Sequence, residues 1–264
     1  MPKIPFLIIA LFMQMGVAFC AEFVVEGTYQ NKNLYVSNPV AAEGFGFCAY
    51  EVTVNGIVTT DEVNAATFEI DFSALSLTFG QPVVVVIKHK DNCEPTVANP
   101  SVLLPVSTFE CEQISVNEDG LISFSTTGER VAINFFIEQY KWNKWVKIGE
   151  MNGKGVAKEN INDYTFKTKL IAGENKFRVS QQSFDGAIRS SQSASIVSAT
   201  PVVAFERNTK EMLFTFTVRT NYEIVDMYGV VKMAANGDKV NYSKLTKGDY
   251  FLNFDNSSVS FTVK

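Results

Sequence analysis

The stretch Thr220–Lys264, TNYEIVDMYGVVKMAANGDKVNYSKLTKGDYFLNFDNSSVSFTVK, decides the fold class of this chain. Apolar and polar side chains alternate along 222–226, 249–254 and 258–264, and a turn at 227–229 leads into an apolar run at 230–233. Period-two alternation divided by Gly, Asn and Asp turns is typical of antiparallel strands. The stretch therefore predicts a small antiparallel β-sandwich, with residues 234–244 as a polar excursion between strands.

Strand patterns of the same kind run upstream and predict an all-β chain. Cys48, Tyr50, Val52 and Val54 alternate up to Asn55-Gly56, a strong hairpin signal. The continuous apolar run at 83–87 predicts a strand buried on both faces, and the three prolines within 95–105 predict a linker. We expect residues 22–105 to form a first β-sandwich module of immunoglobulin-like type.

A second module is predicted over residues 108–198, before a third at 201–264. Its expected strands cover 121–125, 131–140 and 145–151. Tyr164, Phe166 and Leu170 are expected to share one face, as are Phe177 and Val179. Asp185-Gly186 predicts another hairpin. Short strands separated by turns at this spacing are typical of a sandwich, and no helix of ordinary length is indicated.

Two short motifs in the C-terminal stretch resemble those of a known family. Asp226 and Gly229 form a D-x-x-G turn, and Leu245, Gly248 and Tyr250 form an L-x-x-G-x-Y element before a last strand that closes on Lys264. In this order and spacing they resemble the type A C-terminal sorting domain of the Bacteroidota type IX secretion system. Asp249 departs from the apolar or small residue usual before the tyrosine. The resemblance implies export across the outer membrane by the type IX translocon and recognition by the PorV-like shuttle barrel.

The upstream modules carry weaker resemblances. Ile137-Glu138-Gln139, Gly149 and the 173–178 run resemble the fibronectin-type-III-like module that often precedes such a sorting domain, with Phe177 in place of a common tyrosine. The succession of modules also resembles a small family of secreted type IX cargo proteins. If the sorting domain is removed after export, the join at 197–201 is where a sortase-like peptidase would cut.

The first twenty residues predict a signal peptide. Lys3 supplies the positive charge, residues 6–13 form a short apolar core, and Ala18-Phe19-Cys20 fits a cleavage site. An alternative makes Cys20 a lipoprotein anchor, although Phe19 is bulky for that motif. Eight apolar residues are too few to span a bilayer, and the later runs are shorter. We expect a secreted or outer-surface protein that passes through the periplasm and does not itself span a membrane.

Three cysteines follow the signal peptide, so one disulfide and one free thiol are expected in an oxidising compartment. The pairing Cys48–Cys93 is the first choice, and Cys93–Cys111 is the alternative. No C-x-x-C pair or nearby histidine supports a metal site, and no cofactor is predicted.

The net charge of −5 and the absence of a basic patch argue against nucleic acid as a partner.

The residue inventory offers little for catalysis. The single histidine, His89, lies between Lys88 and Lys90, and no G-x-S-x-G motif accompanies it. Acidic pairs such as Asp61 and Glu62 adjoin turn residues and are expected to be solvated. No catalytic residue is predicted, and we expect a non-enzymatic protein that serves the secretion or surface machinery.

Both tryptophans fall within residues 140–145. Trp142 and Trp145 could stack on sugar rings or contact a partner protein; otherwise Trp145 belongs to the core and Trp142 covers it. Lys141, Lys144 and Lys147 could attract an anionic glycan such as surface lipopolysaccharide. The alternative function is therefore a carbohydrate-binding surface adhesin.

Overall fold

The computed structural model describes residues 21–157 and 159–264, and the predicted signal peptide with Cys20 lies outside them. Within the described part, strands follow one another from end to end, and the helical elements are two single 3-10 turns. The chain is all-β, as predicted. It divides between Leu103 and Leu104 into two compact units, which are described one at a time.

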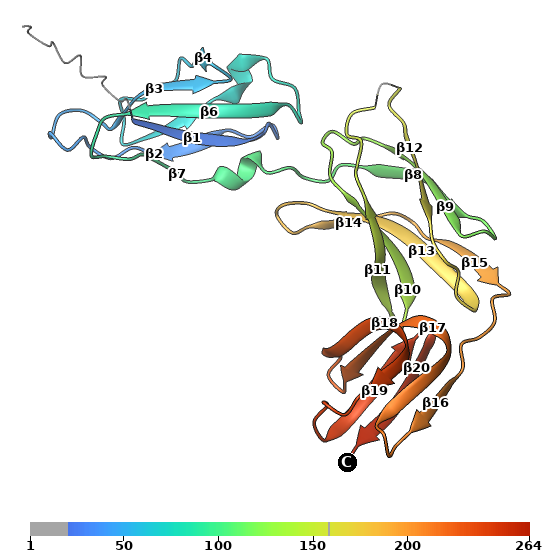
Figure 1. Cartoon of the computed structure of the whole chain (residues 1–264). Helices are drawn as coiled ribbons and strands as arrows, with labels where there is room; N and C mark the ends of the chain where they lie inside the picture. The colour runs from blue at the N-terminus through green and yellow to red at the C-terminus, as the bar shows by residue number, and fades with distance from the viewer. Residues whose placement is uncertain (1–20, 158) are drawn as a thin grey trace, which may run out of the picture. The chain divides into compact units, whose positions relative to one another are not determined.

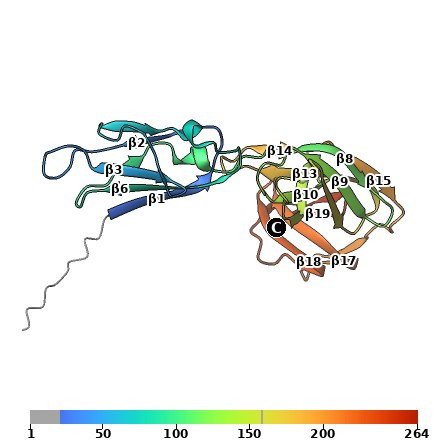
Figure 2. The same cartoon turned by 90° about the horizontal axis from the view of Figure 1, so that it is seen from above.

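The first unit is built from two small antiparallel sheets. One has the strand order β1-β6-β3-β4 and the other β5-β2-β7, and Figures 1 and 2 show β1, β6 and β3 as neighbours. Between them lies a single core that includes Leu34, Val52, Ile70 and Val85. Its elements are β1 Ala21–Thr28, β2 Leu34–Ser37, β3 Ala49–Val54, β4 Ile57–Val58, β5 Thr67–Ile70, η1 Phe72–Leu75, β6 Pro82–His89, β7 Thr96–Val97 and η2 Pro100–Leu103.

The hairpin predicted at Asn55-Gly56 is confirmed, since β3 pairs with β4 across it. Two other details of the first unit's strands differ from the sequence prediction. A bulge between Ala49 and Glu51 shifts the register, so Tyr50 is exposed and breaks the expected alternation. The prediction that 83–87 is buried on both faces is wrong, because one face of β6 is open and leaves Val84 exposed.

The proline-rich segment 95–105 is not a simple linker. Its β7 pairs with β2, and its η2 buries Leu103 completely in the first core. Gly27 makes this packing possible, because a Cβ at that position would stand 2.5 Å from the Cβ of Leu103. The linker prediction failed because proline spacing reveals where regular structure ends, but not whether a segment packs against a core.

The second unit contains two hydrophobic cores. The first lies between the sheets β12-β9-β8 and β11-β10-β13-β14, with β15 also paired to β13. Its strands are β8 Glu110–Val116, β9 Leu121–Thr127, β10 Phe135–Lys141, β11 Lys144–Met151, β12 Asn162–Lys167, β13 Gly173–Gln182, β14 Ile188–Ser190 and β15 Ala194–Ser198. Tyr164, Phe177 and Val179 are buried there. The Asp185-Gly186 turn joins β13 to β14, as predicted.

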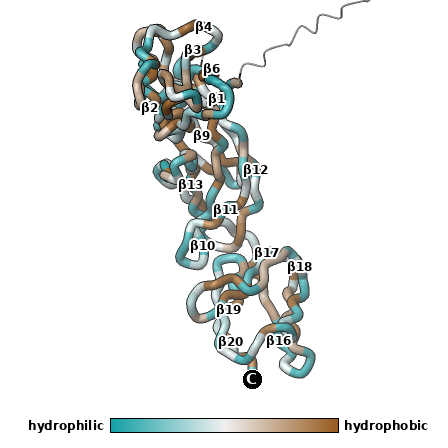
Figure 3. The backbone as a smooth tube through the Cα atoms, turned by 90° about the vertical axis from the view of Figure 1, so that its left-hand side faces the viewer, coloured by the Kyte–Doolittle hydropathy of each residue, from teal (hydrophilic) through white to brown (hydrophobic). Residues whose placement is uncertain are grey.

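The other core belongs to the C-terminal sheet β16-β17-β19-β20, in which β18 also pairs with β17. Its strands are β16 Phe205–Asn208, β17 Leu213–Asp226, β18 Val231–Asn241, β19 Gly248–Phe254 and β20 Ser257–Val263. Phe214, Ile224, Leu252 and Phe261 are buried in it. Burial alternates along β20, as the period-two pattern predicted, whereas Leu252–Phe254 at the end of β19 are buried without alternation. Figure 3 shows these strands coloured by hydropathy.

Two features of this sheet were not predicted. Residues 234–241 continue β18 instead of forming a polar excursion, because Gly237 and Asn236 pair with Thr220 and Asn221 of β17. The second feature is that Tyr222, Glu223, Ile224 and Val225 are all buried, so both faces of β17 are covered near its end. Polar strands on a solvated sheet face are hard to distinguish from loops by composition.

Candidate functional site

The D-x-x-G motif forms a tight turn between β17 and β18. One carboxylate oxygen of Asp226 accepts hydrogen bonds from the backbone N–H groups of Tyr228 and Val230, each at 2.9 Å. Gly229 has a φ of 80°, a conformation that glycine adopts without steric cost. The other oxygen of Asp226 pairs with Lys232 at 2.8 Å, and hydrogen bonding from Lys232 lowers the pKa of Asp226. These residues hold the turn itself.

The L-x-x-G-x-Y motif closes the loop before β19. The backbone N–H of Leu245 donates to the carbonyl of Tyr242, and the buried Tyr250 donates its hydroxyl to the carbonyl of Thr246 at 3.0 Å. Gly248 begins β19 and pairs with Val263 of the last strand. The Tyr250 ring stacks on Phe261. This motif therefore fixes the loop to the last strand, while Lys264 follows that strand and is exposed.

The surface beside the D-x-x-G turn is apolar and open. Met227, Tyr228, Val230 and Val231 are all exposed. Exposed large apolar side chains that adjoin one another mark interaction sites more often than isolated ones do. Asp226 and Gly229 thus hold the turn, and the apolar residues next to them are exposed to solvent.

The two tryptophans lie on the β10–β11 hairpin and are both half-buried. Trp142 occupies the turn with a φ of 55°, and the Lys141 ammonium stands 4.4 Å from its ring centre. Trp145 packs against Tyr140 and carries the Arg178 guanidinium 4.4 Å from its ring centre. A cation therefore already covers one face of each ring.

The tip of this hairpin contacts the C-terminal sheet. Lys144 Nζ lies 2.6 Å from Glu223 Oε1, and Asn253 donates to the same oxygen at 2.8 Å. Lys141 is buried, and this burial lowers its pKa, although the charges of Asp255 and Glu223 oppose the shift. The three lysines predicted to attract a glycan are therefore all engaged within the chain: Lys141 is buried, Lys144 pairs with Glu223, and Lys147 pairs with Glu150.

A second contact supports the same arrangement. The side-chain amide of Asn256, between β19 and β20, donates to the carbonyls of Ala172 and Glu174 at 3.0 and 2.8 Å. These bonds join the start of β13 to the C-terminal hairpin. They explain why the two cores of the second unit belong to one compact unit.

The structure joins Cys48 to Cys93, the pairing that the sequence placed first, with 5.8 Å between their Cα atoms. Cys111 is a free thiol, and burial raises its pKa.

His89 ends β6, and its Nδ1 lies 3.0 Å from the carbonyl of Lys90. Among residues 21–157 and 159–264, no cluster of three metal-ligating side chains occurs, and no helix is long and apolar enough to cross a membrane.

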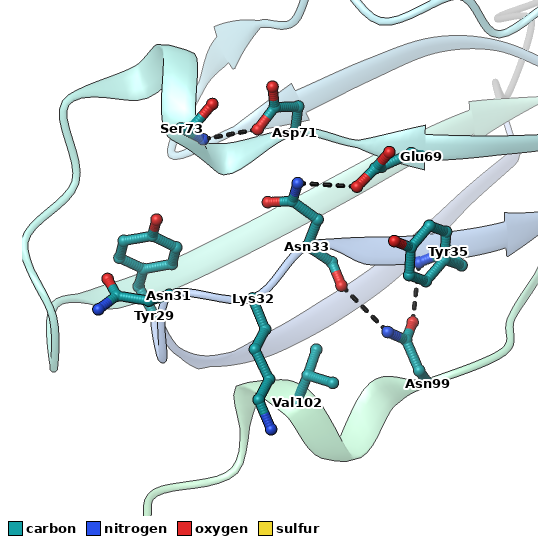
Figure 4. Close-up of a pocket in the computed structure, with 10 residues that line it drawn as sticks. All are labelled: Tyr29, Asn31, Lys32, Asn33, Tyr35, Glu69, Asp71, Ser73, Asn99 and Val102. Carbon is teal, nitrogen blue, oxygen red and sulfur yellow. Dashed lines mark hydrogen bonds between the residues drawn. The ribbon is translucent and has the colours of Figure 1, made fainter.

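The first unit contains a polar groove that the sequence did not indicate. It has a volume of about 460 Å³ and lies over the β2–β5 pair, near η2. Figure 4 shows the exposed ring of Tyr35 beside Glu69, Asn33 and Asn99, with Asp71 and Lys32 nearby. Strand pairing places Tyr35 opposite Glu69, which are 34 positions apart in sequence, so no local motif could have revealed the groove.

Comparison with known proteins gives structural similarities alone. No protein-family model and no curated protein matches the chain. It is similar to the tetra-tandem repeat in the extending region of a large adhesion protein, at 13% identity and TM-score 0.28, over 93% of this chain and 74% of that one. It is also similar to the FN1–FN3 domains of chicken CNTN1, at 8% identity and TM-score 0.22, over 93% and 95%. Similarities this distant say nothing about activity or partners.

Proposed function

We propose that this chain is a non-enzymatic protein of the cell exterior, exported by the type IX secretion system. Residues 201–264 act as its sorting domain, and the PorV-like shuttle barrel is the receptor. The remaining modules are the cargo, which serves the secretion or surface machinery as an accessory. The observation that carries this proposal is the position of both family motifs on turns of one sheet, where each motif residue except Lys264 has a defined structural role.

The C-terminal sheet has the properties that a recognition module needs. It has a hydrophobic core of its own, which includes Phe214, Ile224 and Leu252, so it presents a fixed surface. Its apolar residues at 227–231 remain exposed although hairpin contacts cover the nearby Glu223. A receptor can therefore reach the turn without unfolding the sheet.

The Cys48–Cys93 bond supports the location outside the cytoplasm. Disulfides form and persist in oxidising compartments such as the periplasm and the cell surface. The first unit also has two small sheets and a single core, for which a cross-link contributes stability.

A pull-down tests the proposed partner. The intact protein, carrying an affinity tag within the exposed Glu43–Gly46 turn, is incubated with solubilised outer membranes. We expect it to recover a shuttle barrel of the secretion system. The matched control lacks Tyr222–Lys264 and should recover none. Equal recovery by both proteins would contradict the proposal.

A further inference from the structure

We propose that the polar groove over the β2–β5 pair of the first unit, here named the Tyr35 groove, binds a neutral saccharide. This inference goes beyond the proposed export function, since it assigns a ligand to the cargo. It also differs from the tryptophan hairpin in location. Three features carry it: an exposed aromatic face, polar groups that are already held in place, and a nearly balanced charge.

The aromatic face belongs to Tyr35, whose side chain is 52% exposed although it lies on the central strand of its sheet. Leu34 and Val36 point to the core on either side of it. An aromatic ring held on a strand loses little conformational freedom when a ligand stacks on it. The apolar C–H face of a sugar ring fits such a surface.

Hydrogen bonds fix the polar groups around this ring. The Asn33 amide donates to Glu69 at 2.8 Å, and its oxygen accepts from the backbone N–H of Phe72 at 3.2 Å. The Asn99 oxygen accepts from the Tyr35 N–H at 2.8 Å, and its amide donates to the Asn33 carbonyl at 3.0 Å. Figure 4 shows the bond from Asn33 to Glu69 and the two bonds that join Asn99 to Asn33 and Tyr35. Groups placed in advance lower the entropic cost of binding.

The carboxylates of Glu69 and Asp71, which line the groove, have more acceptor positions than the hydrogen bonds described here occupy. A carboxylate offers about four acceptor positions, and a side-chain amide offers two donors and two acceptors. Hydrogen bonding from Ser73 lowers the pKa of Asp71, so this carboxylate is an acceptor at neutral pH. The negative charge of Glu69 raises the pKa of Tyr35, which keeps the phenol protonated. Adjacent sugar hydroxyls both donate and accept, and they match this mixture.

Charge selects among ligand classes. Glu69 and Asp71 are opposed by Lys32 alone, so the groove repels phosphate, sulfate and uronate groups. Two carboxylates do not make a metal site, in line with the lack of a three-ligand cluster among the described residues. An uncharged ligand rich in hydroxyl groups avoids this repulsion and matches the polar lining and the exposed Tyr35 ring, which is why we assign a neutral saccharide.

Calorimetric titration of the full-length mature protein tests the site, with neutral tetrasaccharides of glucose, mannose and N-acetylglucosamine as probes. At least one probe should bind. Tyr35→Ala should weaken that binding by about 10-fold or more through loss of stacking. Tyr35→Phe should stay within about 3-fold, and Glu69→Gln should weaken binding while the core is untouched. Phe45→Ala removes a more exposed aromatic ring from the same unit, outside the groove, and serves as the matched control.

The outcomes separate the two aromatic surfaces. Loss of binding with Tyr35→Ala and Glu69→Gln, but not with Phe45→Ala or Trp142→Ala, supports the Tyr35 groove. Loss with Trp142→Ala alone would overturn the assignment in favour of the hairpin. Absence of binding by every probe at about 10 mM would overturn the saccharide class itself. Because purified protein is used, the result does not depend on the export proposal.

Discussion

Lys144 at the tip of the β10–β11 hairpin pairs with Glu223 on the C-terminal sheet, with 2.6 Å between Nζ and Oε1. Glu223 is buried, and Asn253 donates to the same oxygen. The pair explains two observations at once: the end of β17 is covered on both faces, and the turn residue Trp142 is half-buried instead of free. The two cores of the second unit are thereby connected through polar contacts.

Loss of this pair should loosen the second unit. Glu223→Ala leaves Lys144 and the Asn253 amide without their acceptor and removes one negative charge near the buried Lys141. It should lower the free energy of unfolding by about 1–3 kcal/mol. Lys144→Ala, on the more exposed side, should cost less than about 1 kcal/mol. Differential scanning calorimetry checks both variants. An equal effect of the two substitutions would show that burial of Glu223 is not what matters.

The disulfide should stabilise the first unit alone. Cys48→Ala with Cys93→Ala should lower its stability by about 2–4 kcal/mol and leave the melting of the second unit unchanged. Cys111→Ser is the matched control and should change little. Without reductant, the mature protein should take up one maleimide, at Cys111, as measured by mass spectrometry of denatured protein. Modification of Cys48 and Cys93 in addition to Cys111 would contradict the disulfide.

The segment 95–103 should behave as part of the first core. Leu103→Ala removes a fully buried side chain and should cost about 2–5 kcal/mol. Gly27→Ala should also lower the stability of the first unit, since its Cβ would clash with Leu103. Val102→Ala, on the half-buried neighbour, is the control and should cost clearly less. Hydrogen exchange of β7 and η2 as slow as that of β2 would confirm the packing, and rapid exchange would restore the linker interpretation.

The contribution of Asp226 to stability should depend on pH. Its pKa is lowered in the folded state by Lys232, so its contribution is present above the unfolded value of about 4 and is lost as the pH falls through the lower folded value. Asp226→Asn keeps the shape of the side chain and removes the charge. The difference in Tm between the two proteins should be largest at neutral pH and shrink as the pH falls below about 4, through the lowered folded-state pKa. A difference in Tm that does not change with pH would show that the turn's hydrogen bonds, and not the charge of Asp226, cause the loss of stability.

Local sequence signals predicted the elements but not the long-range packing. Asn55-Gly56 and Asp185-Gly186 specify their turns through backbone conformation, and apolar residues such as Phe177 and Val179 reveal the buried face through their spacing. Val84 and Leu103 were misassigned because burial depends on which surface another segment covers. Periodicity contains no information about that surface.

The candidate sites show the same difference between local signals and long-range packing. The roles of Asp226 and Gly229 follow from a local motif, since turn, acceptor and glycine lie within four residues. The Tyr35 groove depends on Glu69 and Asn99, which strand pairing and the η2 region bring to Tyr35 from distant positions. Only the fold reveals such a site.

The export proposal is tested most directly by locating the protein in cells of a species that has type IX secretion. Full-length protein and a variant lacking Tyr222–Lys264 are compared by surface proteolysis and fractionation, and protection of Cys48 and Cys93 from alkylation shows that the first unit is folded in both. We expect surface or medium delivery of the full-length protein and periplasmic retention of the truncated form, in which the first unit is still folded. Normal surface delivery of the truncated protein would contradict it.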